Sequence, residues 1–387
     1  TRKQKAGPIM FGPAFPVSAS DVKDMIMNLD ELRKNLSSVD RQLVELIAER
    51  QRIVGDIGKS KRGTGTGTRD YAREKDVLDM GRAQAEALGV DPDLVEALLE
   101  LLIRTSLESQ ERDRVVAEGK GDGRRALVIG GAGKMGRWVA DFFASQGFTT
   151  TIADVTVDDG PNQFKNWTDA GVDFDVIVVA APLAVSGRIL AQLAVLKPRG
   201  LVFDIGSLNS PLLDGLKELR AAGCRVTSLH PMYGPDTRLL SGRHLIFCDA
   251  GDAEATADAK ELFAATMVEQ LDMGLDDHDR LIAYVLGLSH ALNIAFFTAL
   301  AESGEAAPKL AKLSSTTFDS QLLVSAAVAQ DNPHLYFEIQ NLNKFGLGPL
   351  DALCDAARRI RETVADSDEQ AFVELMEKGR EYLALRS

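Results

Sequence analysis

The spacing of apolar residues near the start of the chain predicts a set of long helices. From Leu29 to Ile57, apolar positions recur in alternating steps of three and four, which is typical of a helix packed in coiled-coil fashion. A Gly-Thr run over residues 63–68 ends this helix. Two further amphipathic helices are expected, from about Asp70 to Leu88 and from about Asp91 to Glu118.

The middle of the chain changes to short apolar runs that alternate with helical patterns. Strands are expected at residues 126–130, 149–153, 175–180, 201–205, 225–229 and 245–248. Because helical stretches separate most of these runs, the sheet should be largely parallel. After about Leu271 the strand signal disappears, and the remainder is predicted to be helical.

These patterns predict a multidomain protein of the α and α/β classes, and a length of 387 residues suits several domains. We expect an N-terminal tail over residues 1–27, an all-helical domain over 28–118, a glycine-rich linker over 119–124, an α/β domain with a mostly parallel sheet over 125–273, and an all-helical C-terminal domain over 274–387.

The charge and the cysteines narrow the possible functions. A formal net charge of -13 argues against binding to nucleic acid or to a membrane surface, because both need basic protein surface. The three cysteines form no C-x-x-C pair, so neither a metal site nor a redox motif is predicted, and they fit a reducing compartment. With no signal-peptide pattern visible, we expect a cytoplasmic protein.

One apolar stretch, Leu281–Leu300, is long enough to raise the alternative of a membrane span. It contains polar residues, including His290 and Asn293, and acidic residues flank it. These features favour a helix buried at a domain or subunit interface.

Cationic residues occupy unusual places in the helical region. Arg50 stands where the seam of the first helix calls for an apolar residue, and a buried arginine is costly unless it is paired. One interpretation is a polar residue that fixes the helix register. The other is a ligand site, since Lys61 follows three turns later on nearly the same face.

Arg33 cannot share a small site with Arg50 of the same copy. It lies seventeen residues before Arg50, which is about 25 Å along a continuous helix. If both arginines serve one ligand, a second copy in an antiparallel dimer must contribute Arg33.

The helical region resembles the all-helical class of chorismate mutases over about residues 28–116. The resemblance is carried by LDELRKNLSSVDRQLVELIAERQRIVGDIGKSKR, by RDYAREKDVL and by TSLESQ. It implies a homodimer with shared sites and eight substrate-binding positions. These positions are Arg33 from the partner subunit, Arg50, Lys61, Asp70, Arg73, Glu74, Ser106 and Gln110.

The chemistry of chorismate suits this set of residues. The substrate carries two carboxylates, which arginines bind in two-point fashion. Its rearrangement needs no nucleophile, only a compact conformer and donors for the breaking ether oxygen. Lys61 and Gln110 would be the catalytic donors, and Glu74 would accept from the ring hydroxyl.

A glycine-rich turn marks a nucleotide site in the α/β region. Gly131-Ala-Gly133-Lys134-Met135-Gly136 follows a predicted strand and opens a helix, so its backbone can approach a pyrophosphate. Asp154 follows the next strand, where an acid binds ribose hydroxyls and repels a 2′-phosphate. A Rossmann-like domain that binds NAD is therefore expected, with a plain turn residue as the alternative for Asp154.

The segment Ser228-Leu-His230-Pro-Met-Tyr-Gly-Pro-Asp236 resembles the L-H-P-M-[FY]-G-P motif of prephenate dehydrogenases. GGAGKMGRW, Asp204-Ile-Gly-Ser207 and the spacing from His278 to His290 also match that family. The resemblance implies that His230 takes the proton of the ring hydroxyl as hydride leaves for NAD. It also implies that Ser207 orients the hydroxyl, that Asp236 and His290 bind substrate, and that the C-terminal helices form a dimer.

The sequence departs from this pattern in the segment that starts Leu313-Ser-Ser. Asp319 falls where an arginine for the substrate carboxylate is expected, and Asn209 replaces the lysine of D-x-x-S-x-K. Lys312 or Lys344 is a candidate substitute. Alternatively, Asp319 favours a substrate that bears an amine, or it is merely a surface residue.

We therefore expect a bifunctional enzyme that converts chorismate to prephenate and then to 4-hydroxyphenylpyruvate in tyrosine biosynthesis. A first alternative keeps both chemistries on amino-substituted substrates in specialised metabolism, either arogenate or the pair 4-amino-4-deoxychorismate and 4-amino-4-deoxyprephenate. A second is a regulatory binding protein with an inactive dehydrogenase site, against which His230 and the glycine turn argue.

Overall fold

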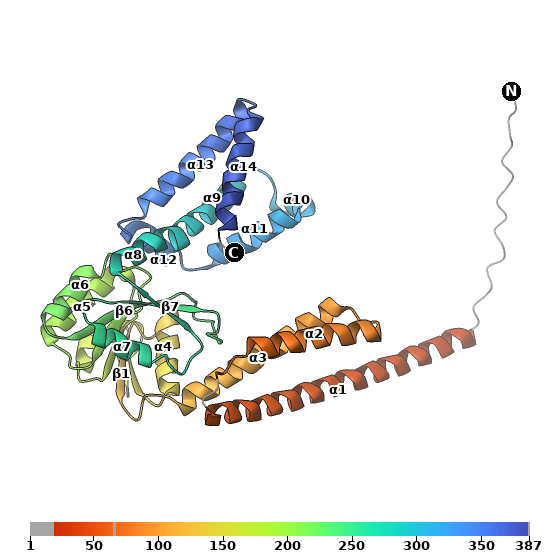
Figure 1. The fold of residues 1–387 in the computed structure, drawn as a ribbon, viewed down its shortest axis with the longest axis horizontal. Coiled ribbons are helices and arrows are strands. Elements are labelled where there is room, and N and C mark those ends of the chain that lie inside the picture. The colour runs from red at the N-terminus through yellow and green to blue at the C-terminus, as the bar shows by residue number, and fades with distance from the viewer. Residues whose placement is uncertain (1–18, 65–66, 386–387) are drawn as a thin grey trace. The chain divides into compact units, whose positions relative to one another are not determined.

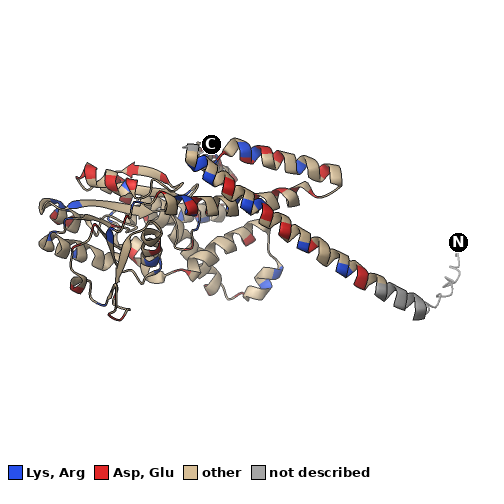
Figure 2. Ribbon diagram, turned by 90° about the horizontal axis from the view of Figure 1, so that it is seen from below, with Lys and Arg blue, Asp and Glu red and all other residues tan. Residues whose placement is uncertain are grey.

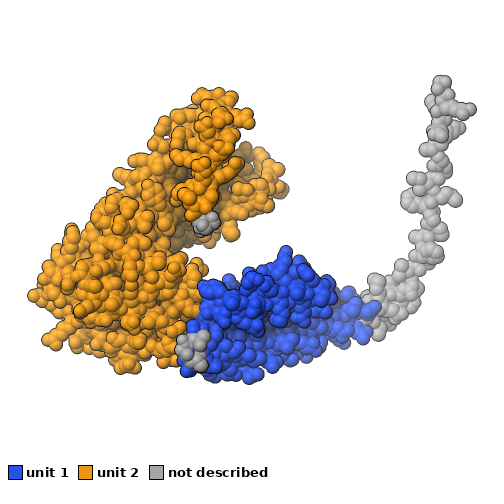
Figure 3. Space-filling view, in the orientation of Figure 1, with its two compact units in different colours: residues 1–110 blue, residues 111–387 orange. Residues whose placement is uncertain are grey.

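The computed structural model describes residues 19–64 and 67–385. The chain divides into two compact units, Thr1–Gln110 and Glu111–Ser387, which Figure 3 shows in different colours. Each unit is described by itself.

The first unit is built from three helices. They are α1 (Ala19–Thr64), α2 (Tyr71–Leu88) and α3 (Pro92–Ala117), of which α3 continues past the end of the unit. The Asp70 side chain caps α2 by accepting from the Arg73 N–H at 3.0 Å, and Gly89 ends α2 in the left-handed region. The three helices expected from the apolar spacing are therefore present.

The start of α1 differs from the expectation of a tail over residues 1–27. The helix begins at Ala19 instead of near Leu29. In the sequence, Val22 and Ile26 precede Leu29 in steps of four and three, so the helical spacing continues toward the N-terminus and agrees with the earlier start. Residues 1–18 of the expected tail lie outside the described part of the chain.

The seam of α1 remains uncovered in the single chain. Leu29, Leu32, Leu36, Val39 and Leu43 are between 45 and 61% exposed. Figure 2 shows basic and acidic residues interspersed along the same helix. An apolar row of this length on a surface marks a protein interface.

The second unit contains an eight-stranded sheet in the order β3-β2-β1-β4-β5-β6-β7-β8. The six strands expected from sequence are β1 (Arg125–Ile129), β2 (Thr149–Ala153), β4 (Val176–Val179), β5 (Leu201–Asp204), β6 (Arg225–Pro231) and β7 (His244–Cys248). In this spatial order, all neighbouring strands from β3 through β2, β1, β4 and β5 to β6 pair in parallel. Strand β7 is antiparallel to β6, and β8 is parallel to β7. The order of the first six strands is that of a Rossmann fold.

Two strands were not expected. These are β3 (Gln163–Phe164) and β8 (Glu269–Met273), which lie at the two edges of the sheet. The first is too short to carry a period, and the second is only partly buried and contains two acids, so its apolar signal is weak. The strand pattern in the sequence was expected to end near Leu271, and this residue lies inside β8.

Alternate side chains of the strands build a core on each face of the sheet. Ala126 and Val128 of β1 pack with α4 (Lys134–Ser145) and α7 (Ala253–Glu261). Leu127 and Ile129 pack with α5 (Leu183–Leu196) and α6 (Leu213–Ala221) on the opposite face. Both faces of the sheet are thus covered, as Figure 1 shows, which explains the continuous apolar runs.

The rest of the second unit is helical, as expected. Its elements are α8 (Leu275–Ile282), the π-helix η2 (Ala283–Leu288), α9 (Ser289–Glu302), α10 (Ala307–Lys312), α11 (Thr316–Gln330), α12 (Pro333–Leu342), α13 (Leu347–Ala365) and α14 (Glu369–Ala384). Glu338 of α12 accepts from the N–H groups of Leu183 and Ala184, and so caps α5 of the sheet domain.

Candidate active sites

A cavity of about 480 Å³ lies between α1, α2 and α3 in the first unit. Seven of the eight polar residues expected from sequence line it. They are Arg50, Lys61, Asp70, Arg73, Glu74, Ser106 and Gln110. Most of the other lining residues are apolar, including Ile53 and Val77, so the polar groups stand on a largely apolar wall.

Arg50 is held in place by α3. Its Nη1 atom donates to the Ser106 hydroxyl at 2.7 Å and to the Leu102 carbonyl at 3.0 Å. Partial burial lowers the pKa of Arg50, although a guanidinium keeps its proton in proteins. The side chain therefore presents a positioned, permanent positive charge to the cavity.

The other two donors are also oriented by backbone carbonyls. Lys61 Nζ donates to the Thr68 carbonyl at 2.8 Å, across the Gly-Thr connection. Gln110 is buried, and its Nε2 atom donates to the Val54 carbonyl at 3.1 Å. Its Oε1 atom has no hydrogen-bond partner among the described residues.

Two of the lining acids have local partners. Asp70 caps α2, and Glu74 pairs with Arg69, whose Nη2 atom lies 2.9 Å from Oε2. Because a cap is itself a structural role, the position of Asp70 is explained without a ligand.

Arg33 does not line the cavity of its own chain. Its side chain is 70% exposed, and Nη1 lies 3.7 Å from Asp30 on the same helix. This separation agrees with the distance argument from sequence.

The glycine turn after β1 has the close contacts that a nucleotide site requires. A Cβ atom on Gly136 would lie 2.1 Å from the Gly130 carbonyl oxygen, and one on Gly131 would lie 2.5 Å from Ile152. Gly130 has a φ of 85°, and a Cβ there would meet the Ala180 carbonyl of the loop after β4 at 2.5 Å. The turn therefore brings bare backbone to the carboxyl ends of β1 and β4, where the strand order reverses.

The remaining residues of the predicted nucleotide site surround this turn. Gly133 caps α4, and Lys134 and Met135 form its first residues, with Lys134 exposed. Asp154 follows β2 and accepts from the Ala132 N–H at 3.2 Å and from the Thr156 hydroxyl at 2.7 Å. The carboxylate thus lies against the glycine turn, and the residues fit a dinucleotide.

His230 lies near the carboxyl end of β6 and belongs to a buried chain of hydrogen bonds. Its Nδ1 atom is 2.8 Å from His278 Nε2, and His278 Nδ1 is 2.8 Å from Asp279 Oδ1. Burial and the neighbouring His278 lower the pKa of His230 to about 3, against the opposing effect of Asp279. His230 is therefore neutral at physiological pH.

Asp279 anchors the far end of this chain. Burial alone would raise its pKa, but hydrogen bonds from His278, Asn209 and Ser210 lower it, so the carboxylate stays ionised. An ionised Asp279 accepts a hydrogen bond, so the proton of His278 is on Nδ1, and His278 Nε2 is left to accept from His230 Nδ1–H. The basic Nε2 atom of His230 is then available for chemistry.

Asn209 stands where the lysine of D-x-x-S-x-K was expected, and it is buried against the hydrogen-bonded chain of His230, His278 and Asp279. Its amide lies 3.0 Å from His278 Nδ1 and accepts from the Ser228 hydroxyl at 2.9 Å. A neutral amide packs there without the burial penalty of an ammonium group. Close by, burial raises the pKa of Asp204 to about 7, against hydrogen bonds that lower it.

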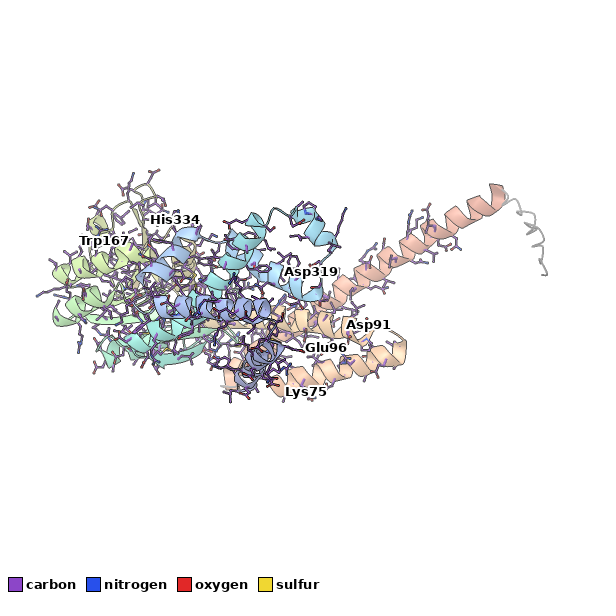
Figure 4. All side chains as sticks on the ribbon, turned by 90° about the horizontal axis from the view of Figure 1, so that it is seen from above. Lys75, Asp91, Glu96, Trp167, Asp319 and His334 are labelled. Carbon is purple, nitrogen blue, oxygen red and sulfur yellow. The ribbon has the colours of Figure 1, made fainter. Side chains whose placement is uncertain are left out.

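Four further predicted site residues lie outside the hydrogen-bonded chain of His230. Ser207 is half-buried after β5, and Asp236 is exposed in the connection between β6 and β7. His290 stacks on Tyr336 with ring centroids 4.0 Å apart. Asp319 is exposed in the first turn of α11, where Figure 4 labels it, and Ser314 donates to its carboxylate.

Sequence reasoning missed the roles of His278 and Asp279, because His278 was used only as a spacing mark. His278 and Asp279 lie among the charged residues Asp276, Asp277 and Arg280 of α8, so no local pattern in the sequence distinguishes them from a solvated helix end.

Comparisons with known proteins match a family to each part of the chain. Residues 32–111 match the family described as chorismate mutase type II, residues 153–270 the nucleotide-binding domain of prephenate dehydrogenase, and residues 275–378 its dimerization domain. The chain belongs to the family in which a type II chorismate mutase is fused to a prephenate dehydrogenase. It is thus an enzyme with a mutase part and a dehydrogenase part, as the sequence predicted.

Individual relatives support each part of this family assignment. The T-protein of Enterobacter agglomerans is 28% identical over 90% of this chain and 91% of its own length. A chorismate mutase of Methanocaldococcus jannaschii is 30% identical over 23% of this chain and 89% of its own length. A 4-amino-4-deoxyprephenate dehydrogenase of Streptomyces pristinaespiralis is 27% identical over 65% of this chain and 88% of its own length.

A solved structure shares the dehydrogenase fold. Prephenate dehydrogenase from A. aeolicus, in complex with hydroxyphenyl propionate and NAD+, aligns with a TM-score of 0.55 at 18% identity, over 68% of this chain and 98% of its own. NAD, the cofactor expected from sequence, agrees with the nucleotide-binding domain.

The long apolar helix belongs to the dimerization match. Leu275–Glu302 is long and apolar enough to cross a membrane by length and composition alone. Because it lies within residues 275–378, its exposed apolar face fits the predicted subunit interface.

Proposed function

We propose that the chain rearranges chorismate to prephenate in the cavity of the first unit, and oxidises prephenate with NAD at His230. The observation that carries the mutase function is the gathering of seven expected polar residues around one cavity. The observation that carries the dehydrogenase function is the buried chain from His230 to Asp279. Both activities belong to tyrosine biosynthesis and are proposed to be cytoplasmic, and NADH formation from chorismate tests them together.

In the mutase site, Arg50 and a second arginine would bind the two carboxylates of chorismate and hold its compact conformer. Lys61 and Gln110 would donate to the ether oxygen as its bond breaks. Gln110 has two N–H groups on Nε2, of which one bonds Val54, so the second can reach the ligand. Ser106 would act by fixing Arg50, and Glu74 would accept from the ring hydroxyl.

We infer that Arg33 of a second copy completes this cavity. The exposed seam of α1 supports this, because burying it needs another helix. A second copy packed antiparallel would carry its Arg33 toward the Arg50 of the first. The dimerization domain gives the two copies an independent reason to stay together.

In the dehydrogenase site, His230 Nε2 would take the proton of the ring hydroxyl while the hydride leaves the same carbon. NAD accepts the hydride when it is bound. The bond to the ring carboxylate then breaks, its electrons enter the ring, and CO2 and 4-hydroxyphenylpyruvate result. Asp279 stabilises the positive charge that develops on His230, because it stays ionised and holds His278 in the tautomer that accepts from His230 Nδ1–H.

The remaining dehydrogenase residues are assigned by position. Ser207 follows β5 at the same sheet edge and would orient the ring hydroxyl, while Asp236 and His290 would contact substrate. Asp154 would bind the adenosine ribose and disfavour a 2′-phosphate, so that NAD is preferred over NADP.

A second candidate keeps the same chemistry on an amine-bearing substrate. Asp319 in place of the expected arginine supports it, and so does similarity to a relative whose name specifies 4-amino-4-deoxyprephenate. Prephenate remains the favoured substrate, because Asp319 is exposed and accepts from Ser314. A purely regulatory role fits poorly with a complete His230 chain.

A further inference from the structure

The backbone segment that follows His230 is an irregular connection with few hydrogen bonds of its own. This segment, residues 232–243, joins β6 to β7 and carries Asp236. Within it, Thr237 N–H donates to Gly234 at 3.1 Å and Arg243 N–H donates to Leu240 at 2.9 Å. Backbone bonds tie its two ends, from the Met232 N–H to His244 at 3.0 Å and from the Glu269 N–H to Arg243 at 2.8 Å, and side chains from other elements contact the residues between them.

Two side chains from outside hold the 232–243 segment. Trp138 of α4 donates from Nε1 to the Thr237 carbonyl at 3.1 Å, and its ring packs edge-on against Tyr233 at 5.2 Å. Glu111 accepts from the Leu240 N–H at 2.7 Å through Oε2. Its other oxygen, Oε1, accepts from the Met267 N–H at 2.5 Å.

Glu111 is buried at 4% exposure, and both of its carboxylate oxygens bond backbone amides. A buried carboxylate is costly unless such bonds satisfy it. Burial raises its pKa, while the bonds from Leu240 and Met267 and the charge of Arg114 lower it. Nearby Tyr233 has a buried hydroxyl, and burial and then the charge of Glu111 raise its pKa, so it stays neutral.

Glu111 belongs by sequence to the mutase and by contacts to the dehydrogenase. It is the last residue of the chorismate mutase match and directly follows Gln110 of the mutase cavity. Its hydrogen bonds nevertheless come from Leu240, in the segment after His230, and from Met267, two residues before β8.

We propose that Glu111 is a positioning residue for the dehydrogenase, which fixes the 232–243 segment and with it the Asp236 side of the substrate site. Loss of its carboxylate leaves two backbone N–H groups without their acceptors, and Leu240 is itself buried. The segment then loosens. His230 is held separately by His278, so substrate binding suffers more than proton transfer.

The proposal rests on the dehydrogenase function above, and full-length Glu111→Gln, Glu111→Ala and Asp113→Ala variants test it. We expect Glu111→Ala to raise the dehydrogenase KM for prephenate about tenfold, with kcat changed less than about threefold. Glu111→Gln keeps one acceptor oxygen and should fall between Glu111→Ala and wild type. Asp113 is exposed on the same helix, so its variant serves as the matched control and should be unchanged.

The fluorescence of Trp138 gives a readout that does not depend on activity. In a Trp167→Phe background, Trp138 is the one remaining tryptophan of the two in the chain, and Figure 4 labels Trp167. Loosening of the segment should expose the indole and shift its emission to the red in the Glu111 variants alone. Unchanged emission together with an unchanged KM in folded Glu111→Gln and Glu111→Ala would overturn the proposal. Absence of NADH formation by the wild type would instead contradict the dehydrogenase function.

Discussion

The Nδ1 atom of His230 lies 2.8 Å from the Nε2 atom of His278, so one imidazole fixes the tautomer of the other. Asp279 bonds the other ring nitrogen of His278, Nδ1, and so fixes the proton there. His278 Nε2 is then an acceptor, which fixes the proton of His230 on Nδ1. The outcome is a neutral His230 with its basic nitrogen directed away from His278. This arrangement predicts how the dehydrogenase kcat should change when His278 or Asp279, which bond His230 directly or through His278, is replaced.

Replacing His278 with Gln should lower the dehydrogenase kcat by about a hundredfold, because His230 loses the path that stabilises its protonated form. Asp279→Asn should cost about tenfold, since an amide oxygen can still accept from His278 but carries no charge. KM for prephenate should change little in either variant. Asp277→Asn is the control, because Asp277 is exposed and pairs with Arg280. Steady-state NADH formation checks these values, and a kcat for His278→Gln within twofold of wild type would remove the relay from the mechanism.

Sharing of the mutase site between subunits predicts complementation. Arg33→Ala and Lys61→Ala chains should each be nearly inactive as mutases. When the two are mixed under conditions that exchange subunits, each heterodimer should hold one intact site and one site with both substitutions. Mutase activity should then recover to about a quarter of wild type, because half of the dimers are mixed and half of their sites are intact. Proven exchange without recovery would contradict the shared site.

The buried Asp204 predicts an unusual dependence of stability on pH. Its pKa is about 7 in the folded chain and about 3.9 when unfolded. Between these values the folded state binds the extra proton, so the stability from Asp204 is complete below about pH 4 and is lost as pH rises through 7. Asp204→Asn mimics the protonated form and should remove this loss, which is at most about 4 kcal/mol. The unfolding temperature of Asp204→Asn relative to wild type should therefore rise from pH 5 to pH 8. Asp173→Asn, at a fully exposed acid, is the control, and a difference independent of pH would count against a protonated Asp204.

The substrate choice predicts how Asp319 should behave. An exposed Asp319 that accepts from Ser314 should leave the ratio of kcat/KM for prephenate to that for arogenate unchanged on Asp319→Ala. The same ratio should exceed one in the wild type. If Asp319 instead selects an amine, the wild type should prefer arogenate, and Asp319→Arg should reverse the preference, because a guanidinium binds a carboxylate in a two-point fork.

The parts of the molecule that sequence predicted best are those fixed by local geometry. Arg50 and Lys61 could be placed on one face because helical spacing sets which residues of a helix lie together, while Gln110 on α3 was predicted from the resemblance to chorismate mutases. The glycine turn was predictable for the same reason, since strand, turn and helix are contiguous. His278 could not be placed against His230, because 48 residues and two further strands separate them and only the tertiary fold joins them. Strand β8 escaped because an edge strand with partial burial needs little apolar sequence.

Asp319 illustrates a different limit. Its place in the L-S-S segment could be read from sequence, but its exposure and its bond to Ser314 could not. Whether a charged side chain lines a pocket depends on packing between helices, which residue spacing within one helix does not determine.

The most direct test of two linked activities in one chain is NADH formation when chorismate and NAD are added to the purified protein. The wild type should convert chorismate to prephenate and then produce NADH. Lys61→Ala should produce NADH from prephenate but not from chorismate, while His230→Asn should consume chorismate and produce no NADH from either compound. NADH formation by His230→Asn at the wild-type rate, or by Lys61→Ala from chorismate, would contradict the assignment of the two sites.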